Sequence, residues 1–407
     1  IEQCEGSIMF DDEDALKTVL QSAKGRGLAV VFGNEVKCVQ QKVIDICDGC
    51  IEIPQYGTKH SMNVSVTAGI VMWEFAKRLL CPLIMLMLAG LFSACEEKGG
   101  AETVHHKFTT EAKCHITPVK NQGRSESCWI YAMLATIESN RIAVGDSINL
   151  SPALYESAII EKDADRIYMN KWMWKICMRG MIPHTMRLID RHGAFVYETF
   201  SLKRKGKNMR VVARGAERLA RQDAGYGCGI EKFREHLADY MDSEIGLAPK
   251  NMYLYSMIYT PQEFGRSVVM PYDYSFYGAD LQFPDRRDGD EIQQTSPKKM
   301  LAMAEQSLRK GYAVCWEGDI SEPGFDWENG VADAPVTTEE QYRRDIARFK
   351  TTDDHSMELC GISHDEQGRK YFICKNSWGR SNRFKGLIFM SFDYFLAKTL
   401  VIGVYNR

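Results

Sequence analysis

The sequence predicts an α+β fold for residues 107–407, with a helical lobe and an antiparallel β lobe, and an α/β fragment for residues 1–76. Three patterns lead to this prediction. An apolar run with helical spacing begins at Cys128. Two strand-like runs, 359–363 and 370–374, flank a turn-rich tetrapeptide. Near the other end of the chain, residues 28–32 form a short apolar run typical of a buried strand.

Length and composition indicate an ordinary globular protein of two or three domains. The chain has 407 residues, of which 45% are hydrophobic and 26% are charged. A net charge of -3 gives no sign of a surface for nucleic acid or for a strongly charged substrate. The 13 cysteines are scattered and predict buried side chains rather than a disulfide framework. Cys47 and Cys50 form a CxxC pair without a second pair, so no metal site is predicted.

The first 76 residues contain short segments that follow one another as strand and helix. An amphipathic stretch around residues 14–20 precedes the apolar run 28–32, and an apolar helix is expected to end near Phe75. Because the chain begins with Ile1, we expect that it is a fragment whose start lies upstream.

Three phrases in this region resemble the C-terminal part of SpoU-type, trefoil-knot RNA ribose methyltransferases. They are GNE at 33–35, IEIPQ at 51–55 and SMNVSVTAG at 61–69, and the resemblance runs from about residue 10 to 76. It implies an α/β trefoil-knot fragment in which Gly33, Ile53 and Met62 would touch S-adenosylmethionine and whose substrate would be RNA.

The upstream motif that carries the catalytic arginine of that family has no counterpart here, and about half of the usual domain is missing. A partial sheet with an open edge is a poor basis for a stable enzyme. We therefore expect the fragment to be truncated and inactive, as a remnant of a neighbouring gene or a merged reading frame would be.

Residues 77–95 have the pattern of a signal peptide. Lys77 and Arg78 precede an apolar run at 79–92, and small residues stand before Cys95. The run is short for a membrane span, which needs about 20 apolar residues. The segment resembles the lipobox of bacterial lipoproteins, which implies a lipidated Cys95 and a position in the bacterial cell envelope. A buried core helix is the alternative, and an unused segment would leave the protein in the cytoplasm.

Residues 96–106 are predicted to form a solvated linker, and residues 107–407 are predicted to form one domain. The candidate nucleophile of this domain is Cys128. A helix begins at this cysteine, and the positive end of the helix dipole is expected to lower the pKa of its thiol. A neighbouring histidine could accept the thiol proton and later protonate a leaving amine.

The predicted hairpin places a histidine and an asparagine close together. If the turn is centred between Glu366 and Gln367, residues that face each other across the hairpin have numbers that sum to 733. His355 and Asn376 sum to 731, so they would be diagonal neighbours on one face of the sheet. The Asn376 amide could then accept from the imidazole and fix its tautomer. Gln122 would supply a side-chain N–H that, with the backbone N–H of Cys128, forms an oxyanion hole.

The order Gln122, Cys128, His355, Asn376 resembles that of the papain-like cysteine peptidases. The closer resemblance is to their bleomycin hydrolase or aminopeptidase C branch. The further segments that carry it are Trp129, Trp378, residues 179–183 and 192–198, residues 311–319 and an insertion around residues 200–300.

The resemblance to this branch implies a two-lobe papain-like fold and aminopeptidase action without a cofactor. Papain itself has Cys-Gly-Ser before the nucleophile, so Ser125 leaves the usual disulfide partner absent. The branch often has Ser-Gly-Arg there, so Glu126 and Ser127 are departures, and Glu126 would raise the thiol pKa slightly.

The leading hypothesis is a cysteine peptidase that acts on a peptide substrate through Cys128, His355, Asn376 and Gln122. The second hypothesis is an S-adenosylmethionine-dependent RNA 2'-O-methyltransferase from the N-terminal fragment. The third is a binding module that keeps the cleft with an unreactive thiol, and the presence of all four residues argues against it. The choice between endo- and exopeptidase action, the substrate sequence and the oligomeric state stay open.

Overall fold

The computed structural model describes residues 7–10, 12, 29–32, 39, 41–53, 67–68, 70–72, 75, 107–170, 175–202, 208–254, 256–279, 285 and 289–407. The chain divides into two compact units, residues 1–104 and 105–407.

The N-terminal unit has a small parallel pair of strands. β1 (Ile8–Met9) pairs with β2 (Ile51–Glu52), and the short helix α2 (Gln41–Ile44) lies between them in the sequence. Ile51, Val71 and Phe75 are buried together, and Ile53 packs against them. The predicted strand at 28–32 contributes Val30 and Phe32 to the same cluster, although its described part is not assigned as a strand.

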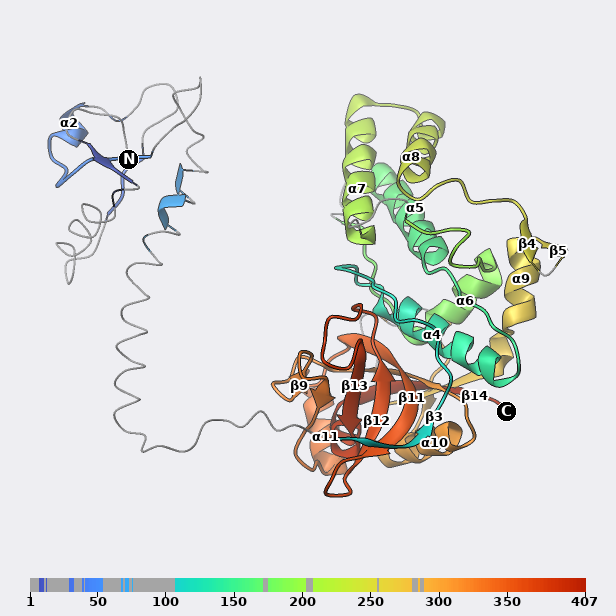
Figure 1. Ribbon diagram of the computed structural model, residues 1–407. Helices are drawn as coiled ribbons and strands as arrows, with labels where there is room; N and C mark the ends of the chain where they lie inside the picture. Colours follow the sequence, from blue (N-terminus) through green and yellow to red (C-terminus); the bar gives the residue numbers. More distant parts are fainter. Residues whose placement is uncertain are drawn as a thin grey trace, which may run out of the picture. The chain divides into compact units, whose positions relative to one another are not determined.

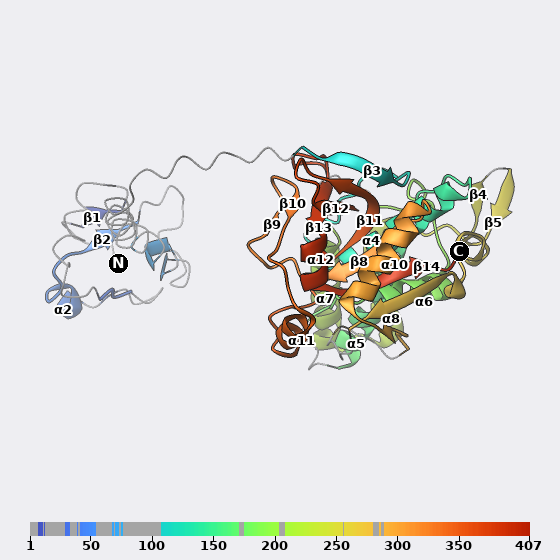
Figure 2. The same ribbon diagram turned by 90° about the horizontal axis from the view of Figure 1, so that it is seen from below.

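The C-terminal unit is built on a mixed, mainly antiparallel sheet of ten described strands (Figures 1 and 2). In spatial order the sheet runs β7 (Gln293–Gln294), β6 (Tyr274–Gly278), β14 (Thr399–Tyr405), β8 (Val314–Gly318), β11 (His355–His364), β12 (Lys370–Lys375), β13 (Leu387–Ser391), β10 (Val331–Ala332), β9 (Phe325–Asp326), with β3 (Thr109–Lys113) beside β11.

β11 is the central strand of this sheet, and nine of its ten residues are buried. It contacts β8, β12 and β3, so its backbone groups are paired on both edges. A turn joins it to β12, where the Asp365 carboxylate accepts from the N–H groups of Gln367 and Arg369 at 3.0 and 2.8 Å. Gly368 occupies the left-handed region with φ +80°, which favours glycine.

The helices of this unit lie on both sides of α4 in Figure 1, because α5 to α9 lie on one side and α10 and α11 lie with the sheet on the other. They are α4 (Cys128–Ala143), α5 (Ala153–Met169), α6 (Ile182–His192), α7 (Met209–Tyr226), α8 (Ile230–Glu244), α9 (Pro261–Val268), α10 (Pro297–Arg309), α11 (Glu339–Ala347) and α12 (Phe392–Lys398). A short 3₁₀ turn (Pro271–Asp273) and a hairpin of β4 (Met252–Leu254) and β5 (Met257–Tyr259) complete the described elements.

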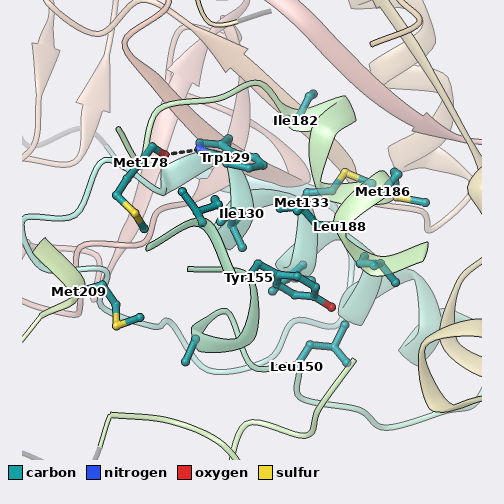
Figure 3. Packing of buried hydrophobic residues seen from close by; sticks show 14 of the residues in the cluster. Trp129, Ile130, Met133, Leu150, Tyr155, Met178, Ile182, Met186, Leu188 and Met209 are labelled. Carbon is teal, nitrogen blue, oxygen red and sulfur yellow. Dashed lines mark hydrogen bonds between the residues drawn. The ribbon is translucent and has the colours of Figure 1, made fainter. Parts of the chain in front are cut away.

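α4 lies at the junction of the helices and the sheet, because it contacts β11 and β8 as well as α6. The predicted stripe of Ile130, Met133, Leu134 and Ile137 is buried, but so are most of the other residues of the helix. α4 is therefore a central helix, buried nearly all round, rather than an amphipathic surface helix. The Trp129 indole N–H donates to the backbone oxygen of Met178 at 2.9 Å and fixes the first turn of α4 (Figure 3).

The insertion expected around residues 200–300 contains α7 and α8, which pack against α5 and each other. Both helices have apolar faces that join the core of the helical side, through Val212 and Ala216 of α7 and Phe233 and Leu237 of α8. This insertion adds a helical layer to the lobe that carries Cys128.

Candidate active site

Cys128 is the first residue of α4, which places its backbone N–H at the positive end of the helix. Ser127 occupies the N-cap position, but its side chain does not cap the helix. The Cys128 side chain is half-buried, and its sulfur accepts hydrogen bonds from the backbone N–H groups of Trp129 and Ser356. Because Ser356 follows His355, these contacts connect the start of α4 with the start of β11.

His355 opens β11, and Asn376 directly follows the last residue of β12. The hairpin brings them together, since Asn376 Oδ1 lies 2.7 Å from His355 Nε2 and also accepts from the Ser377 N–H at 2.7 Å. An amide oxygen only accepts, so Nε2 carries the ring proton and Nδ1 of the neutral imidazole is left as a base. Trp378 packs on the imidazole with its ring centroid 4.7 Å away.

The Gln122 side chain is held at both ends and is buried. Its Nε2 donates to the backbone oxygen of Ser125 at 2.6 Å, and its Oε1 accepts from the Ser377 hydroxyl. The backbone N–H of Gln122 also donates to the backbone oxygen of Ser377 at 2.8 Å. An amide nitrogen has two N–H groups, so a second donor of Nε2 remains beyond the one that Ser125 uses.

One cavity of about 340 Å³ brings Gln122, Cys128 and His355 together, between Trp129 and Trp378. Asn376 is not among its lining residues and lies behind the imidazole that it contacts. A larger cavity of about 700 Å³ runs along α5 and α8 and contains none of these four residues. The smaller cavity is therefore the candidate active site.

The environment holds both the nucleophile and the base neutral. Burial lowers the pKa of His355 to about 4, although the hydrogen bond with Asn376 opposes this shift. Burial also raises the pKa of the Cys128 thiol to about 12, and the charges of Asp353 and Glu317 add to the rise. The backbone N–H groups of Trp129, in the first turn of α4, and of Ser356 lower the thiol pKa, as expected at a helix start, but burial outweighs this effect.

Two carboxyl groups that sequence reasoning missed lie beside the nucleophile. Asp353 lines the cavity, and Glu317 is buried on β8, where it accepts from the Ile182 N–H at 3.3 Å. Burial raises the pKa of Asp353 to about 7 and that of Glu317 well above its ordinary value, and the two carboxyl groups share a hydrogen bond. The charges of Asp353 and Glu317 raise the pKa of the Cys128 thiol, which is the effect that was expected of Glu126. Asp353 precedes His355 by two residues, but only the folded sheet shows that Glu317 lies near it.

Other predicted residues lie partly outside the described part of the chain. Ile53 is described and packs in the small N-terminal cluster, whereas Gly33 and Met62 lie outside the described residues. Residues 77–95, including Cys95, also lie outside them. In the part of the chain that the structure does describe, every helix is too short or too polar to cross a bilayer. Nor do the described side chains form a group of three or more that could hold a metal ion.

Comparison of the sequence with known proteins assigns the N-terminal segment. Residues 5–73 match the model of the SpoU rRNA Methylase family. The tRNA (guanosine(18)-2'-O)-methyltransferase of Aquifex aeolicus is 44% identical over 45 residues, which are 11% of this chain and 21% of that protein. The chain thus spans about a fifth of the length of the methyltransferases that it matches first. The SpoU resemblance of this segment is confirmed.

The remainder of the chain is similar to proteins of a different kind. Papaya proteinase 4 of Carica papaya is 26% identical over 115 residues, which are 28% of this chain and 30% of that protein. The crystal structure of pepw from Lactobacillus rhamnosis HN001 is similar to the fold described here, with a TM-score of 0.56 and 15% identity. This likeness covers 73% of the present chain and 82% of pepw. The predicted papain-like fold is confirmed.

Proposed function

We propose that this protein is a cysteine peptidase that hydrolyses peptide bonds with Cys128 as nucleophile and His355 as general base and acid. Asn376 orients the imidazole, and Gln122 together with the Cys128 N–H binds the oxyanion. The observation that carries the proposal is the cavity shared by Gln122, Cys128 and His355, with the His355 Nε2 bonded to Asn376 at 2.7 Å.

The reaction begins from a neutral thiol and a neutral imidazole. His355 Nδ1 takes the proton of the Cys128 thiol as the sulfur attacks the scissile carbonyl carbon. The carbonyl oxygen becomes an anion and is bound by the N–H groups of Gln122 and Cys128. Collapse of this intermediate breaks the C–N bond, and the imidazolium gives its proton to the leaving amine. Water, deprotonated by His355, then hydrolyses the thioester and restores the thiol.

Hydrolysis of a library of short peptides by the purified protein tests this proposal. Cys128→Ala should abolish turnover, and His355→Ala should lower kcat by about 10²–10⁴-fold because general acid–base catalysis is lost. Gln122→Ala should lower kcat by about 10²–10³-fold through the loss of one oxyanion donor. Turnover that survives in Cys128→Ala would assign the hydrolysis to another group or to a contaminant.

A finer assignment is an aminopeptidase of the bleomycin hydrolase type. Its support is the sequence resemblance over residues 179–183 and 311–319, which goes beyond the four site residues. An aminopeptidase should cleave peptides with a free α-amino group and leave their N-acetylated counterparts intact. Equal rates on both would indicate endopeptidase action instead.

A second candidate function comes from the family match of residues 5–73. It is transfer of a methyl group from S-adenosylmethionine to the ribose 2'-oxygen of RNA. We expect these residues by themselves to be inactive, because they span about a fifth of the length of the methyltransferases they match. Equilibrium dialysis with labelled S-adenosylmethionine should show no binding. A dissociation constant in the micromolar range would support this second function.

The location that we propose is the bacterial cell envelope, with the peptidase anchored through a lipid on Cys95. The support is the sequence pattern of residues 77–95. Mass spectrometry of the mature protein should find a diacylglyceryl-modified Cys95 as its first residue. A mature chain that retains residues 1–94 would place the protein in the cytoplasm.

A further inference from the structure

A buried carboxyl group, Glu156 of α5, lies directly under the chain segment that leads to the nucleophile. Glu156 is 1% exposed. Its Oε1 accepts from the hydroxyls of Ser127 at 2.5 Å and Ser125 at 3.1 Å, and its Oε2 accepts from Tyr131 at 3.4 Å. Three hydroxyl groups from one stretch of chain therefore converge on one carboxyl group.

These contacts lie between the two proposed oxyanion donors. Ser125 and Ser127 are the residues that connect Gln122 with Cys128. Ser125 also accepts the Gln122 Nε2–H at its backbone oxygen, at 2.6 Å, so a shift of Ser125 would move the amide of Gln122. Ser127 immediately precedes Cys128, so its position sets the direction of the Cys128 N–H.

The Ser127 hydroxyl is used in an unusual way. A serine at the N-cap of a helix normally accepts from a backbone N–H of the first turn. Ser127 makes no such bond and donates to Glu156 instead. The first N–H groups of α4 are thus left without a side-chain cap, on the side of the helix that faces the cavity.

The presence of an acid at this buried position needs a reason other than stability. Burial raises the pKa of Glu156 to about 7, and the hydrogen bonds from Ser127, Ser125 and Tyr131 oppose this rise. A buried carboxylate that is held only by hydroxyls is costly, and a well-packed apolar side chain is often at least as stable. What the carboxylate provides is a fixed geometry for two serines at once.

We propose that Glu156 is a positioning residue that holds the Ser125–Ser127 segment so that the Gln122 side chain and the Cys128 N–H point at the same oxyanion. Glu156 itself does not touch the substrate, since it is absent from the lining of the active-site cavity. The inference rests on the proposed peptidase function and adds the residue that orders its oxyanion hole.

Two rates measured on the same variants test the inference. Peptide hydrolysis needs the oxyanion donors, whereas alkylation of Cys128 by iodoacetamide needs only the thiol and its base. Glu156→Ala should lower kcat by about 10–100-fold, within the range for partial loss of oxyanion donors. KM and the alkylation rate should change by less than about threefold. Glu156→Gln, which retains an acceptor oxygen for the serines, should recover part of the loss.

The double variant Ser125→Ala/Ser127→Ala probes the same contact from the other side and leaves Glu156 in place. It should lower kcat about as much as Glu156→Ala, and combining all three changes should add little, because they remove one shared interaction. Glu161→Ala, on an exposed position of the same helix, is the matched control and should keep the wild-type kcat.

An unchanged kcat in the folded Ser125→Ala/Ser127→Ala and Glu156→Gln variants would overturn the inference. So would a parallel fall of kcat and of the alkylation rate, because that pattern indicates general disruption of the site. A wild-type protein that is alkylated at Cys128 but hydrolyses no peptide would overturn the proposed function first, and this inference with it.

Discussion

The side chains of Cys128 and His355 are both neutral at pH 7 in their folded surroundings. The pKa of the thiol is about 12 and that of the imidazole about 4, and burial is the main cause of both shifts. A resting thiolate–imidazolium pair is therefore not expected. Proton transfer from sulfur to nitrogen accompanies attack on the substrate, when the oxyanion donors can compensate for the charge that develops.

The carboxyl group of Asp353 opposes ionisation of Cys128. Asp353→Asn removes one of the charges that raise the pKa of Cys128, so this pKa should fall. The pH profile of iodoacetamide alkylation measures it, and the profile should move to lower pH than in the wild type. Asp354→Asn is the control, because Asp354 lines the same cavity but is not among the main causes of the Cys128 shift. Equal profiles for both variants would contradict this assignment.

The buried imidazole of His355 makes the stability of the folded protein depend on pH. Between pH 6.5 and about 4, the unfolded chain binds a proton at this residue and the folded chain does not. The free energy of unfolding should therefore decrease as the pH falls through this window, by up to about 3 kcal/mol. His355→Gln should remove this component, so in urea unfolding the wild type should lose stability relative to the variant as the pH falls from 6.5 to about 4. Parallel curves across this range would show that His355 is not buried as a neutral base.

At the residue scale, the sequence was informative where chemistry depends on residue type. A cysteine, a histidine, an asparagine and a glutamine have few other reasons to occur in this order with flanking tryptophans. Glu156, Glu317 and Asp353 could not be recognised in the same way, because a carboxylate in a sequence normally indicates a solvated surface. Only the tertiary fold reveals that Glu156 and Glu317 are buried.

At the scale of elements, the hairpin of β11 and β12 determines where His355 and Asn376 lie. The predicted register, with residue numbers summing to 733, is confirmed for Glu358 with Lys375 and for Leu359 with Cys374. Beyond Leu359 the register shifts by one residue at an irregularity next to Gly361. No local pattern in the sequence signals this bulge, because it depends on how β11 pairs with the strands on both of its edges.

A buried ion pair joins these two strands next to the site. Glu358 Oε2 lies 3.3 Å from Lys375 Nζ, with side-chain exposures of 0% and 3%. Lys375→Met would leave the Glu358 charge buried without its partner and should lower the free energy of unfolding by about 3–5 kcal/mol. The double change Glu358→Leu/Lys375→Met should recover most of the loss.

Urea unfolding measures both variants of this pair. Lys370→Met is the control on the same strand, because Lys370 pairs with Glu305 at the surface and should contribute at most about 1 kcal/mol. If the double variant were as unstable as Lys375→Met alone, the cost would come from packing rather than from an unpaired charge.

At the scale of the whole molecule, the two units of the chain resemble proteins of different kinds. The proposed peptidase site lies within residues 105–407, and all four proposed site residues come from that unit. A variant that lacks residues 1–106 should fold and keep kcat/KM for peptides within about twofold, as expected for domains with separate cores. Circular dichroism and the peptide assay measure this. An unfolded or inactive product would show that the N-terminal unit supports the peptidase.

The fold of the larger unit could be predicted in outline because a helix beginning at Cys128 and a hairpin carrying His355 define two lobes. The spatial order of the ten described strands and the central burial of α4 could not, since both result from long-range packing. In the same way, Trp129 was recognised as a neighbour of the nucleophile, but its hydrogen bond to Met178 connects segments 49 residues apart.

The most direct test of the central claim is mass spectrometry of the folded protein after reaction with a thiol-directed epoxide inhibitor. The account predicts one adduct per chain, located at Cys128, absent in Cys128→Ala and strongly reduced in His355→Ala. An adduct at the exposed Cys47 instead, or no adduct on folded wild-type protein, would contradict the assignment of Cys128 and His355 as an active pair.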